Sequence, residues 1–210
     1  MCTRFYTERD DPELSAIGEA ALNSPLAQRF YRAEGSAILT QGEIRPTNIV
    51  PVIASSKSGN RTVFPMKWGF NIPIEHKTVP KLVVNARSET AAHKHSFADP
   101  WASHRCIVPA SWYFEWEHYT NPAGRSCVGD KYSIQPKGSS VTWLCGLYRI
   151  EDGLPRFVIL TLAPVPELAK IHDRMPLMLP KEQTDAWIDP TVNPSDLLQY
   201  AVKDVVMWKE

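Results

Sequence analysis

The sequence lacks an excess of charge of either sign. Its 210 residues include 23 lysines and arginines against 23 aspartates and glutamates, so the formal net charge is zero. A protein that binds long tracts of nucleic acid through its overall charge carries a clearly basic face or domain. The charge balance excludes such a protein, and any contact with a polyanion must therefore come from a local patch of basic side chains.

Long apolar runs and closely spaced cysteines are also missing. No apolar run approaches the ~20 residues that a helix needs to cross a bilayer, and the first residues lack the pattern of a secretory signal. The four cysteines, Cys2, Cys106, Cys127 and Cys145, are too far apart for a CxxC motif. The six histidines form no convincing metal site. We therefore expect a cytoplasmic protein with reduced thiols, no membrane segment, and neither a metal nor an organic cofactor.

The pattern of apolar residues predicts an α+β fold in a single domain over residues 1–210. Helix-start signals at Asp11-Pro12 and Ser24-Pro25 predict two peripheral helices. Short segments rich in β-branched and aromatic residues predict a mainly antiparallel sheet that curls into a barrel-like core. The predicted strands are 3–6, the end of 43–53, 61–66, 81–84, 105–108, 112–117, 131–134, 141–148 and 156–162, and further helices are expected at 164–171, 181–188 and 194–202.

Cys2 has the most distinctive chemistry in the chain. If Met1 is removed, as is usual before a small second residue, Cys2 carries an α-amine and a thiol on adjacent carbons. Such a 1,2-aminothiol condenses with an aldehyde to an imine, and the thiol then closes a thiazolidine ring. An α-amine has a pKa of ~7.7–8.0 against ~10.4 for lysine, so the terminal amine is neutral more often by roughly two orders of magnitude at pH 7. Cys2 is therefore a candidate nucleophile, although many free cysteines are simply small buried hydrophobes.

Two predicted strands carry polar side chains that folding alone does not require. After the strand that ends at Val84, Asn85 and Arg87 either orient a phosphate or sugar from the sheet edge or form an ordinary turn with a helix N-cap. In 112–117, Glu115 stands between large aromatic residues, where burial would raise its pKa and suit it to proton transfer near neutrality. A solvent-facing acid on a half-buried strand is the alternative interpretation of Glu115.

The remaining candidates are a histidine and a tryptophan. His172 follows a predicted helix, so it is either a proton shuttle near pH 7 or a histidine that interacts with the helix dipole. Trp68 precedes Gly69, and a glycine allows close approach of a ligand. The Trp68 ring could stack on an unpaired base, but core packing is the stronger interpretation.

Taken together, these segments resemble the SRAP family (SOS response-associated peptidase), the abasic-site processing proteins. The resemblance implies that Cys2 reacts with the ring-opened aldehyde of an abasic site in single-stranded DNA. The product would be a thiazolidine DNA–protein crosslink that shields the lesion during the DNA damage response. The matching motifs follow the family order over nearly the whole chain: Cys2 with Arg4-Phe5, Pro46-Thr47, Trp68-Gly69, the run 85–90, the run 105–110, Phe114-Glu115-Trp116, Thr161 and the run 172–176.

The resemblance also implies catalytic roles for individual residues. Asn85 would orient the Cys2 terminus and the sugar, and Glu115 would handle protons at the amine and the imine. His172 would assist the opening or closing of the deoxyribose. Family members are also described as autopeptidases, but only Met1 precedes Cys2 here, so autopeptidase and DNA lyase-like activities are secondary candidates.

The expected partner is single-stranded DNA containing an abasic site. By resemblance, Arg4 and Arg87 would hold phosphates that flank the lesion, and Pro46, Trp68 and Thr161 would contribute to the DNA site. The replication machinery is a further candidate partner. The protein would then be cytoplasmic, and associated with the nucleoid when it is bound to DNA.

Two other functions fit the same residues. A cysteine hydrolase would use Cys106 as nucleophile with His172 and Glu115 as base and orienting group. Cys106 lies in an apolar strand, however, where a thiol is expected to be buried and inert. A non-covalent module would hold single strands through arginines and aromatic rings, with salt-sensitive binding that does not depend on an abasic site.

Overall fold

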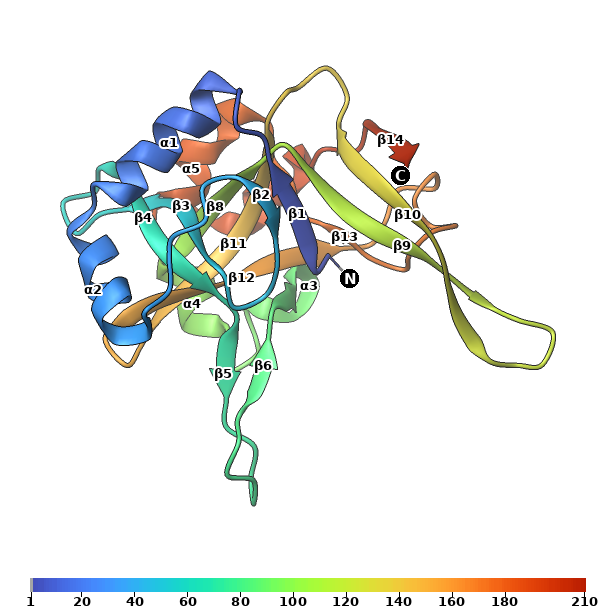
Figure 1. Ribbon diagram of the computed structural model, residues 1–210, viewed down its shortest axis with the longest axis horizontal. Coiled ribbons are helices and arrows are strands. Elements are labelled where there is room, and N and C mark those ends of the chain that lie inside the picture. Colours follow the sequence, from blue (N-terminus) through green and yellow to red (C-terminus); the bar gives the residue numbers. More distant parts are fainter. Residues whose placement is uncertain (1) are drawn as a thin grey trace.

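A closed ring of five strands forms the centre of the protein, which a computed structural model describes over residues 2–210 (Figure 1). The antiparallel pairs are β4 with β3, β3 with β8, β8 with β11, and β11 with β12. Parallel pairing of β12 with β4 closes the ring. This confirms the predicted α+β class with a mainly antiparallel, barrel-like core. The five strands are β3 (Ile49–Ser55), β4 (Arg61–Trp68), β8 (Arg105–Ala110), β11 (Thr142–Glu151) and β12 (Leu154–Leu162).

A second sheet lies beside the ring, with the strand order β14-β10-β9-β1-β2. The first strand of the chain, β1, is paired on both sides, by β2 and by β9. The edge strand β14 follows no pattern that we predicted from the sequence. The bounds are β1 (Arg4–Thr7), β2 (Gly42–Ile44), β9 (Trp112–Thr120), β10 (Ser126–Pro136) and β14 (Val205–Lys209).

Two short strands extend the ring at the C-terminal half of β12. β7 (Asn85–Arg87) pairs with β12 in parallel and places Asn85 opposite Ile159. β13 (Met175–Pro176) pairs with β12 antiparallel and places Pro176 opposite Thr161. Residues from three distant parts of the sequence therefore meet at this end of β12.

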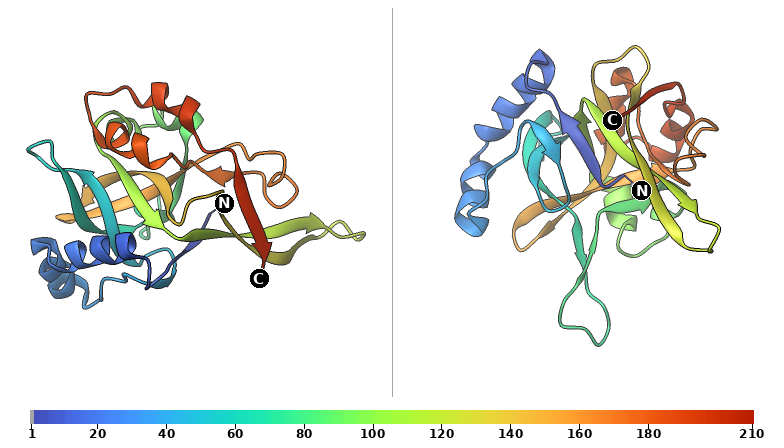
Figure 2. Two further views of the ribbon diagram at one scale, coloured as in Figure 1. Left: turned by 90° about the horizontal axis from the view of Figure 1, so that it is seen from above. Right: turned by 45° about the vertical axis from the view of Figure 1, so that its right-hand side comes forward.

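Two arms project from the body of the protein (Figures 1 and 2). One is the long hairpin of β9 and β10. The other is the hairpin of β5 (Phe70–Ile72) and β6 (Lys81–Val83), which follows directly after β4. Gly69 joins β4 to β5 with φ +114°, and a Cβ there would lie 2.6 Å from Leu82 Cδ1. Only glycine fits this junction without strain.

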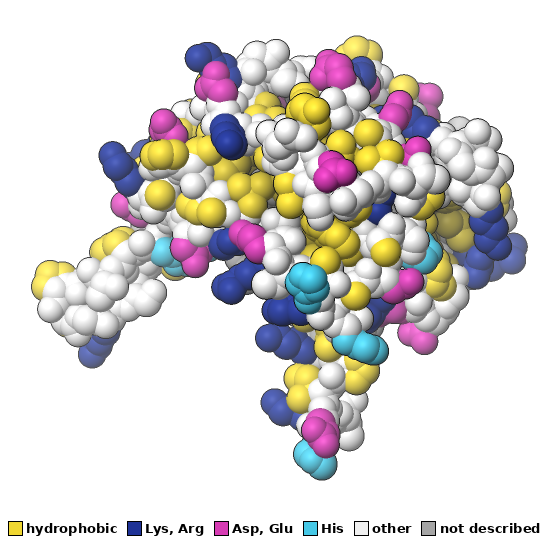
Figure 3. All heavy atoms as spheres, turned by 180° about the vertical axis from the view of Figure 1, so that it is seen from behind, with side chains coloured by type: hydrophobic (Ala, Val, Ile, Leu, Met, Phe, Trp, Pro, Cys, Tyr) yellow, Lys and Arg dark blue, Asp and Glu magenta, His cyan; other side chains and the backbone are white. Residues whose placement is uncertain are grey.

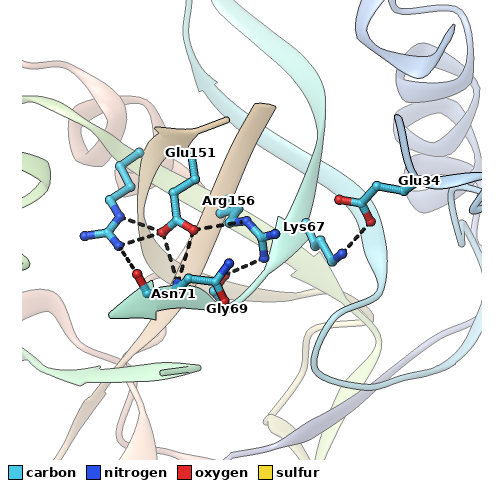
Figure 4. A network of polar contacts seen from close by, with 7 residues as sticks. Glu34, Lys67, Gly69, Asn71, Glu151 and Arg156 are labelled. Atoms are coloured by element: carbon cyan, nitrogen blue, oxygen red, sulfur yellow. Dashed lines mark hydrogen bonds and ion pairs between the residues drawn. The ribbon is translucent and has the colours of Figure 1, made fainter. Parts of the chain in front are cut away.

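A carboxylate at the root of the shorter arm holds it against the ring (Figure 4). Glu151 accepts hydrogen bonds from Arg149 Nε at 2.8 Å and from the main-chain N–H of Asn71 at 3.1 Å. Its second oxygen lies 3.1 Å from Arg156 Nε. Because these groups come from β5, β11 and β12, the network fixes where the arm leaves the body.

The helices lie at the periphery, and the two near the N-terminus are capped as the sequence predicted. Asp11 accepts from the N–H groups of Glu13 and Leu14, and Ser24 accepts from Leu26. An ion pair between Lys67 and Glu34 ties β4 to the second helix (Figure 4). The α-helices are α1 (Pro12–Leu22), α2 (Pro25–Glu34), α3 (Ser88–Ala91), α4 (Ala98–Ser103), α5 (Thr184–Ile188) and α6 (Pro194–Leu197), with 3-10 turns at Lys181–Gln183 and Leu198–Tyr200.

The prediction of a helix over 164–171 is wrong. These residues form successive turns, in which the N–H groups of Leu168 and Ala169 both donate to Val165 O. Val165 precedes Pro166, and a residue before proline is biased away from the helical region. A regular helix could therefore start only at Pro166, and from there to residue 171 the chain forms turns instead.

Cys2 lies in the apolar core. It shares a cluster with Phe5 and Trp68, whose ring centroids are 5.3 Å apart. Neighbouring residues of β12 alternate between this cluster and a second one, with Ile159 in the first and Val158 in the second. Within residues 2–210, no helix combines the length and the apolar character needed to span a membrane.

A buried arginine joins the ring to the C-terminal helices. Arg105 on β8 is 1% exposed, and its guanidinium contacts no carboxylate among the residues that the structure describes. All of its hydrogen bonds go to main-chain carbonyl oxygens, which surround the guanidinium and accept from its N–H groups. We call this set of acceptors the carbonyl cage. The acceptors belong to Trp101, Ala102, Trp187, Asp189 and Val192.

Candidate active site

Cys2 is held by an amide from a neighbouring strand. It directly precedes β1, and its residue is 0% exposed. The side-chain Nδ2 of Asn85 donates to the main-chain carbonyl of Cys2 at 2.8 Å. Because Asn85 is fixed by the parallel pairing of β7 with β12, this hydrogen bond sets where the start of the chain lies. The two residues that the sequence analysis associated with each other are thus in direct contact.

The thiol of Cys2 is in its neutral form at pH 7. Burial raises its pKa, and the charge of Glu115 raises it further. A thiol becomes a strong nucleophile only as the thiolate. The Cys2 sulfur therefore needs a nearby base at the moment it reacts, in contrast to the low-pKa thiols of cysteine proteases.

Glu115 is the buried acid beside Cys2. It lies on β9, the strand that pairs with β1, and it is 4% exposed. Burial raises its pKa to about 7. The alternative of a solvent-facing acid is therefore wrong, and the buried position follows from the aromatic residues around it. A carboxyl group with this pKa is present in both protonation states near neutrality, as a general acid–base group should be.

Tyr113 is a further residue of the site that was not among the candidates predicted from the sequence. It lies two residues before Glu115, on the same face of β9, and it is fully buried. Burial raises its pKa, and Cys2 and Glu115 raise it further because each carries a negative charge when it is ionised, so the phenol keeps its proton. Among the described residues, Tyr113 Oη and Asn85 Oδ1 are both buried without a hydrogen-bond partner. The period-two alternation through Glu115 was the signal that could have identified Tyr113.

His172 lies in the loop that runs between β12 and β13, and its side chain is 15% exposed. Its Nδ1 accepts from the main-chain N–H of Arg174 at 3.1 Å and lies 2.8 Å from Asp173 Oδ1. Burial lowers the pKa of His172. The neutral ring with its proton on Nε2 fits the hydrogen bond from Arg174, whereas the contact with Asp173 favours the charged ring. The interpretation as a helix-end histidine is wrong, because residues 166–171, directly before His172, form turns and not a helix.

The arginines of this region differ in their surroundings. Arg174 makes two hydrogen bonds to the carboxylate of Glu89, at 2.8 and 2.7 Å, and a third to Thr161 O at 2.7 Å. Arg87 is exposed at the end of β7, opposite Thr161 in the parallel register. Thr161 itself is fully buried and donates to Ala86 O at 3.3 Å. Arg87 thus faces solvent at this end of β12, whereas Arg174 is paired with Glu89.

The other predicted DNA-binding residues are either paired at the surface or buried in the core. Arg4 pairs with Glu43 at 2.7 Å, and its guanidinium lies 5.2 Å from the centre of the Trp116 ring. Pro46 is half-buried in the turn after β2. Trp68 is 0% exposed and donates from Nε1 to Val84 O at 2.9 Å. The structure therefore confirms the core-packing interpretation of Trp68 and leaves no face of its ring for a base.

Basic side chains gather between the two arms (Figure 3). Exposed basic residues include Arg87 on β7, Lys94 shortly after α3 and Lys81 on β6, the second strand of the shorter arm. A chain with no net charge thus has a local basic face, which is the only way in which the composition allowed it to contact a polyanion.

The site of the competing cysteine hydrolase is not formed. Cys106 is fully buried in β8, and burial raises the pKa of its thiol. A Cβ placed at Gly146 would lie 2.9 Å from the Cys106 sulfur, which shows how closely the neighbouring strand β11 covers it. A substrate has no path to this sulfur.

Comparison with known proteins identifies the family. The family described as SOS response associated peptidase (SRAP) matches residues 1–208, so the chain belongs to this family. The abasic site processing protein YobE of Bacillus subtilis (strain 168) is 32% identical over 173 residues, which are 77% of this chain and 76% of YobE. The abasic site processing protein YedK of Escherichia coli (strain K12) is 26% identical over 170 residues, with 76% and 71% covered.

Solved structures share the fold. A crystal structure of a protein from Bacteroides thetaiotaomicron matches with a TM-score of 0.70 and 21% identity, over 98% of this chain and 91% of that chain. A phage-related protein from Bordetella bronchiseptica matches with a TM-score of 0.67 and 17% identity, over 100% and 94%. At these identities the likeness shows the fold alone.

Proposed function

We propose that this protein captures abasic sites in single-stranded DNA by forming a thiazolidine crosslink at Cys2, once Met1 has been removed. The observation that carries the proposal is the buried Glu115, with a pKa of about 7, whose charge acts on the Cys2 thiol. The names of the relatives, abasic site processing proteins, support the choice of substrate. The contact of Asn85 with Cys2 supports the placement of the reacting terminus.

The first step joins the α-amine of Cys2 to C1′ of the ring-opened sugar. Ionised Glu115 accepts a proton from the α-ammonium group, and the free amine attacks the aldehyde carbon to give a carbinolamine. Protonated Glu115 then donates to the carbinolamine hydroxyl, which leaves as water, and the C=N bond of the imine forms. A single carboxyl group can serve both transfers because it is present in both forms near pH 7.

The second step closes the ring. The Cys2 thiol loses its proton to a base, the sulfur bonds to C1′ of the protonated imine, and the electron pair of the C=N double bond moves to the nitrogen, which keeps the proton that it already carries. Overall, one aldehyde and one aminothiol give a thiazolidine and one water. The raised pKa of the thiol explains why a base is needed, and the charge of Glu115 already acts on this thiol. We therefore propose Glu115 as the base, with His172 as a second candidate.

The remaining residues act on the sugar and its phosphates. Neutral His172 can accept the proton of the C1′ hydroxyl as the closed sugar opens to the aldehyde. The phenol of Tyr113 is a proton donor for oxygen on the reacting carbon. Exposed Arg87, next to the buried Thr161, is suited to hold a phosphate that flanks the lesion.

Intact mass spectrometry tests the proposal. Wild-type protein without Met1 is mixed with a single-stranded oligonucleotide that carries one abasic site. We expect a product with the mass of both components less one water, stable without borohydride. Cys2→Ser should give no such product, and Cys127→Ser, which changes the half-buried thiol on the longer arm, should behave as wild type.

Two outcomes would overturn it. One is a stable crosslink formed by Cys2→Ser at the wild-type rate. The other is binding of the strand without a mass increase, equally well with and without the abasic site, which is the behaviour of a non-covalent module. The same spectra report whether Met1 is present before DNA is added. Loss of Met1 in wild type but not in Glu115→Gln would assign an autopeptidase activity to this site.

A further inference from the structure

A cavity of about 350 Å³ lies apart from the Cys2 site. It opens between α2, the turn from β3 to β4, and the hairpin of β11 and β12. Figure 1 shows α2 and this hairpin turn together on the far side of the body from the N-terminus. Along β12, the cavity reaches Pro155, while Asn85 of the candidate active site lies opposite Ile159. The two sites are thus separated by four residues of one strand, or roughly 13 Å.

Aromatic rings form the floor of this cavity. Phe64 from β4 and Tyr148 from β11 both line it. The ring of His104 meets Tyr148 edge to face, with centroids 5.2 Å apart, and His104 O accepts the main-chain N–H of Tyr148 at 2.8 Å. Tyr148 is therefore fixed in place, and a fixed aromatic surface is what a flat ring stacks on.

Two cations stand at the rim. Arg29 of α2 donates from Nη2 to Gly153 O at 2.8 Å, so its guanidinium is held at the mouth of the cavity. Lys57 is exposed in the turn between β3 and β4, next to Ser56. Among residues 2–210, neither cation forms an ion pair with a carboxylate, and no aspartate or glutamate lines the cavity. The rim therefore presents positive charge that the protein itself does not neutralise.

Two of the three lysines that line another large cavity differ from Arg29 and Lys57 in that each is paired with a carboxylate. That cavity lies beside the loop between β10 and β11. There, Lys137 lies 3.5 Å from Asp204, and Lys181 lies 2.5 Å from Glu13. These lysines already have carboxylate partners, so an incoming anion would have to compete with them. At the rim that carries Arg29 and Lys57, an incoming anion would meet no competing carboxylate.

We propose that the cavity between α2 and the β11–β12 hairpin binds a nucleoside monophosphate, with its base on Tyr148 and Phe64 and its phosphate at Arg29 and Lys57. The volume lies within the range of roughly 300–1,000 Å³ that is typical of small-molecule sites. Hydroxyl donors at the same rim, such as Ser56, suit phosphate oxygens. The same chemistry belongs to a free nucleotide and to the phosphorylated end of a DNA strand.

Nuclear magnetic resonance titration of the full chain with 2′-deoxyadenosine 5′-monophosphate tests the site. We expect shifts of the amides of residues 55–57 and 148–153, and binding at least tenfold tighter than that of adenosine or inorganic phosphate alone. Tyr148→Phe keeps the ring and should retain binding, whereas Tyr148→Leu should weaken it by tenfold or more. Equal affinity for phosphate alone, or no shifts at these amides up to 5 mM nucleotide, would overturn the proposal.

Charge variants give the matched comparison. Arg29→Gln and Lys57→Gln should each weaken nucleotide binding about tenfold. Arg32→Gln, on the same helix but outside the cavity, should leave it unchanged. Equal losses in Arg29→Gln and Arg32→Gln would show only general attraction between charges. Short oligonucleotides with and without a 5′-phosphate distinguish a strand end from a free nucleotide.

Nucleotide binding in this cavity can be tested separately from the proposed crosslinking. Cys2→Ser should bind the nucleotide as well as wild type does, and Arg29→Gln should form the crosslink at the wild-type rate. A protein that crosslinks but does not bind the nucleotide refutes the cavity alone. A protein that binds the nucleotide but does not crosslink refutes the chemistry at Cys2 alone.

Discussion

The imidazole rings of His118 and His172 meet edge to face, with their centroids 5.2 Å apart and their planes at 90°. The main-chain N–H of His118 also donates to Ile171 O at 3.2 Å. His118 lies on β9, three residues after Glu115, so this one strand holds the buried acid and also contacts the loop that carries His172. The two proton-transfer candidates are therefore fixed relative to each other through β9.

Removing the His118 ring should raise the pKa of His172. Burial is the main cause of its lowered pKa, and His118 lowers it further, whereas Asp173 raises it. With His118→Asn, His172 should charge at a higher pH, so crosslinking should lose rate near pH 6 more than at pH 8. A titration of the His172 ring protons by nuclear magnetic resonance measures the shift. His76→Asn, on the shorter arm, is the control, and an unchanged His172 titration in His118→Asn would contradict the prediction.

Glu115 should make folding stability fall as the pH rises. Its pKa rises on folding from 4.5 to about 7. The folded state therefore holds the proton more tightly than the unfolded state, and this contribution is complete below pH 4.5 and lost as the pH rises through 7. Glu115→Gln should be more stable than wild type at pH 8.5, by on the order of 3 kcal/mol, with the difference shrinking toward pH 4.5.

Urea unfolding of both proteins between pH 4.5 and 8.5 measures this difference. Glu117→Gln, two residues further along β9, is the matched control and should change the free energy of unfolding by no more than about 0.5 kcal/mol. The prediction fails if Glu115→Gln shows a constant difference from wild type at every pH. The same variant should form the crosslink more slowly, so stability and activity should change in opposite directions.

Asn85→Ala should lower the crosslinking rate much more than it lowers the stability of the fold. The variant loses one hydrogen bond to Cys2, which stabilises the fold by about 1 kcal/mol. Because that bond places the reacting terminus, we expect the crosslinking rate to fall by about tenfold to a hundredfold. Rates from mass spectrometry and unfolding curves from the same preparation give both quantities.

Asn121→Ala is the comparison for that experiment. Asn121 accepts hydrogen bonds from Ala123 and Arg125 in the tip of the longer arm, far along the hairpin from Glu115. It should lose stability to a similar extent but retain the rate. Equal rates in Asn85→Ala and wild type would remove Asn85 from the site.

Arg105→Lys should strongly destabilise the protein. An ammonium group cannot replace a fork that reaches carbonyl groups on several sides, so buried acceptors lose their partners. We expect a loss of at least about 3 kcal/mol in the free energy of unfolding, as is usual when a buried charge loses its partners. Arg125→Lys at the exposed tip of the longer arm should stay within about 0.5 kcal/mol of wild type. A small effect of Arg105→Lys would mean that the carbonyl cage adds little stability.

Local sequence signals predicted an element correctly where neighbouring residues determine its structure. The caps at Asp11 and Ser24 fix two helices within a few residues of themselves, and alternation through Glu115 identified a strand. The prediction failed over 164–171 because two prolines outweighed an otherwise helical pattern. It also missed β14, since Val205–Lys209 is a strand only because β10 offers an edge to pair with.

The arrangement of the site depends on contacts that no local pattern specifies. Asn85 meets Cys2 because β7 pairs with β12 some 74 positions further along, at Ile159. The resemblance to a known family supplied the residues in advance, but their placement comes from the sheet. Trp68 shows the opposite case, in which an aromatic residue beside a glycine is used for packing.

The carbonyl cage around Arg105 also bears on how the chain folds as it is made. Three of its acceptors, Trp187, Asp189 and Val192, lie more than 80 residues after the arginine. When β8 has been made, the carbonyl groups of Trp101 and Ala102 are available to Arg105 but its other three partners do not yet exist, so water must solvate that side of the guanidinium until they emerge. We expect the ring of strands to stay open around β8 during synthesis and to close only when the last tenth of the chain has been made.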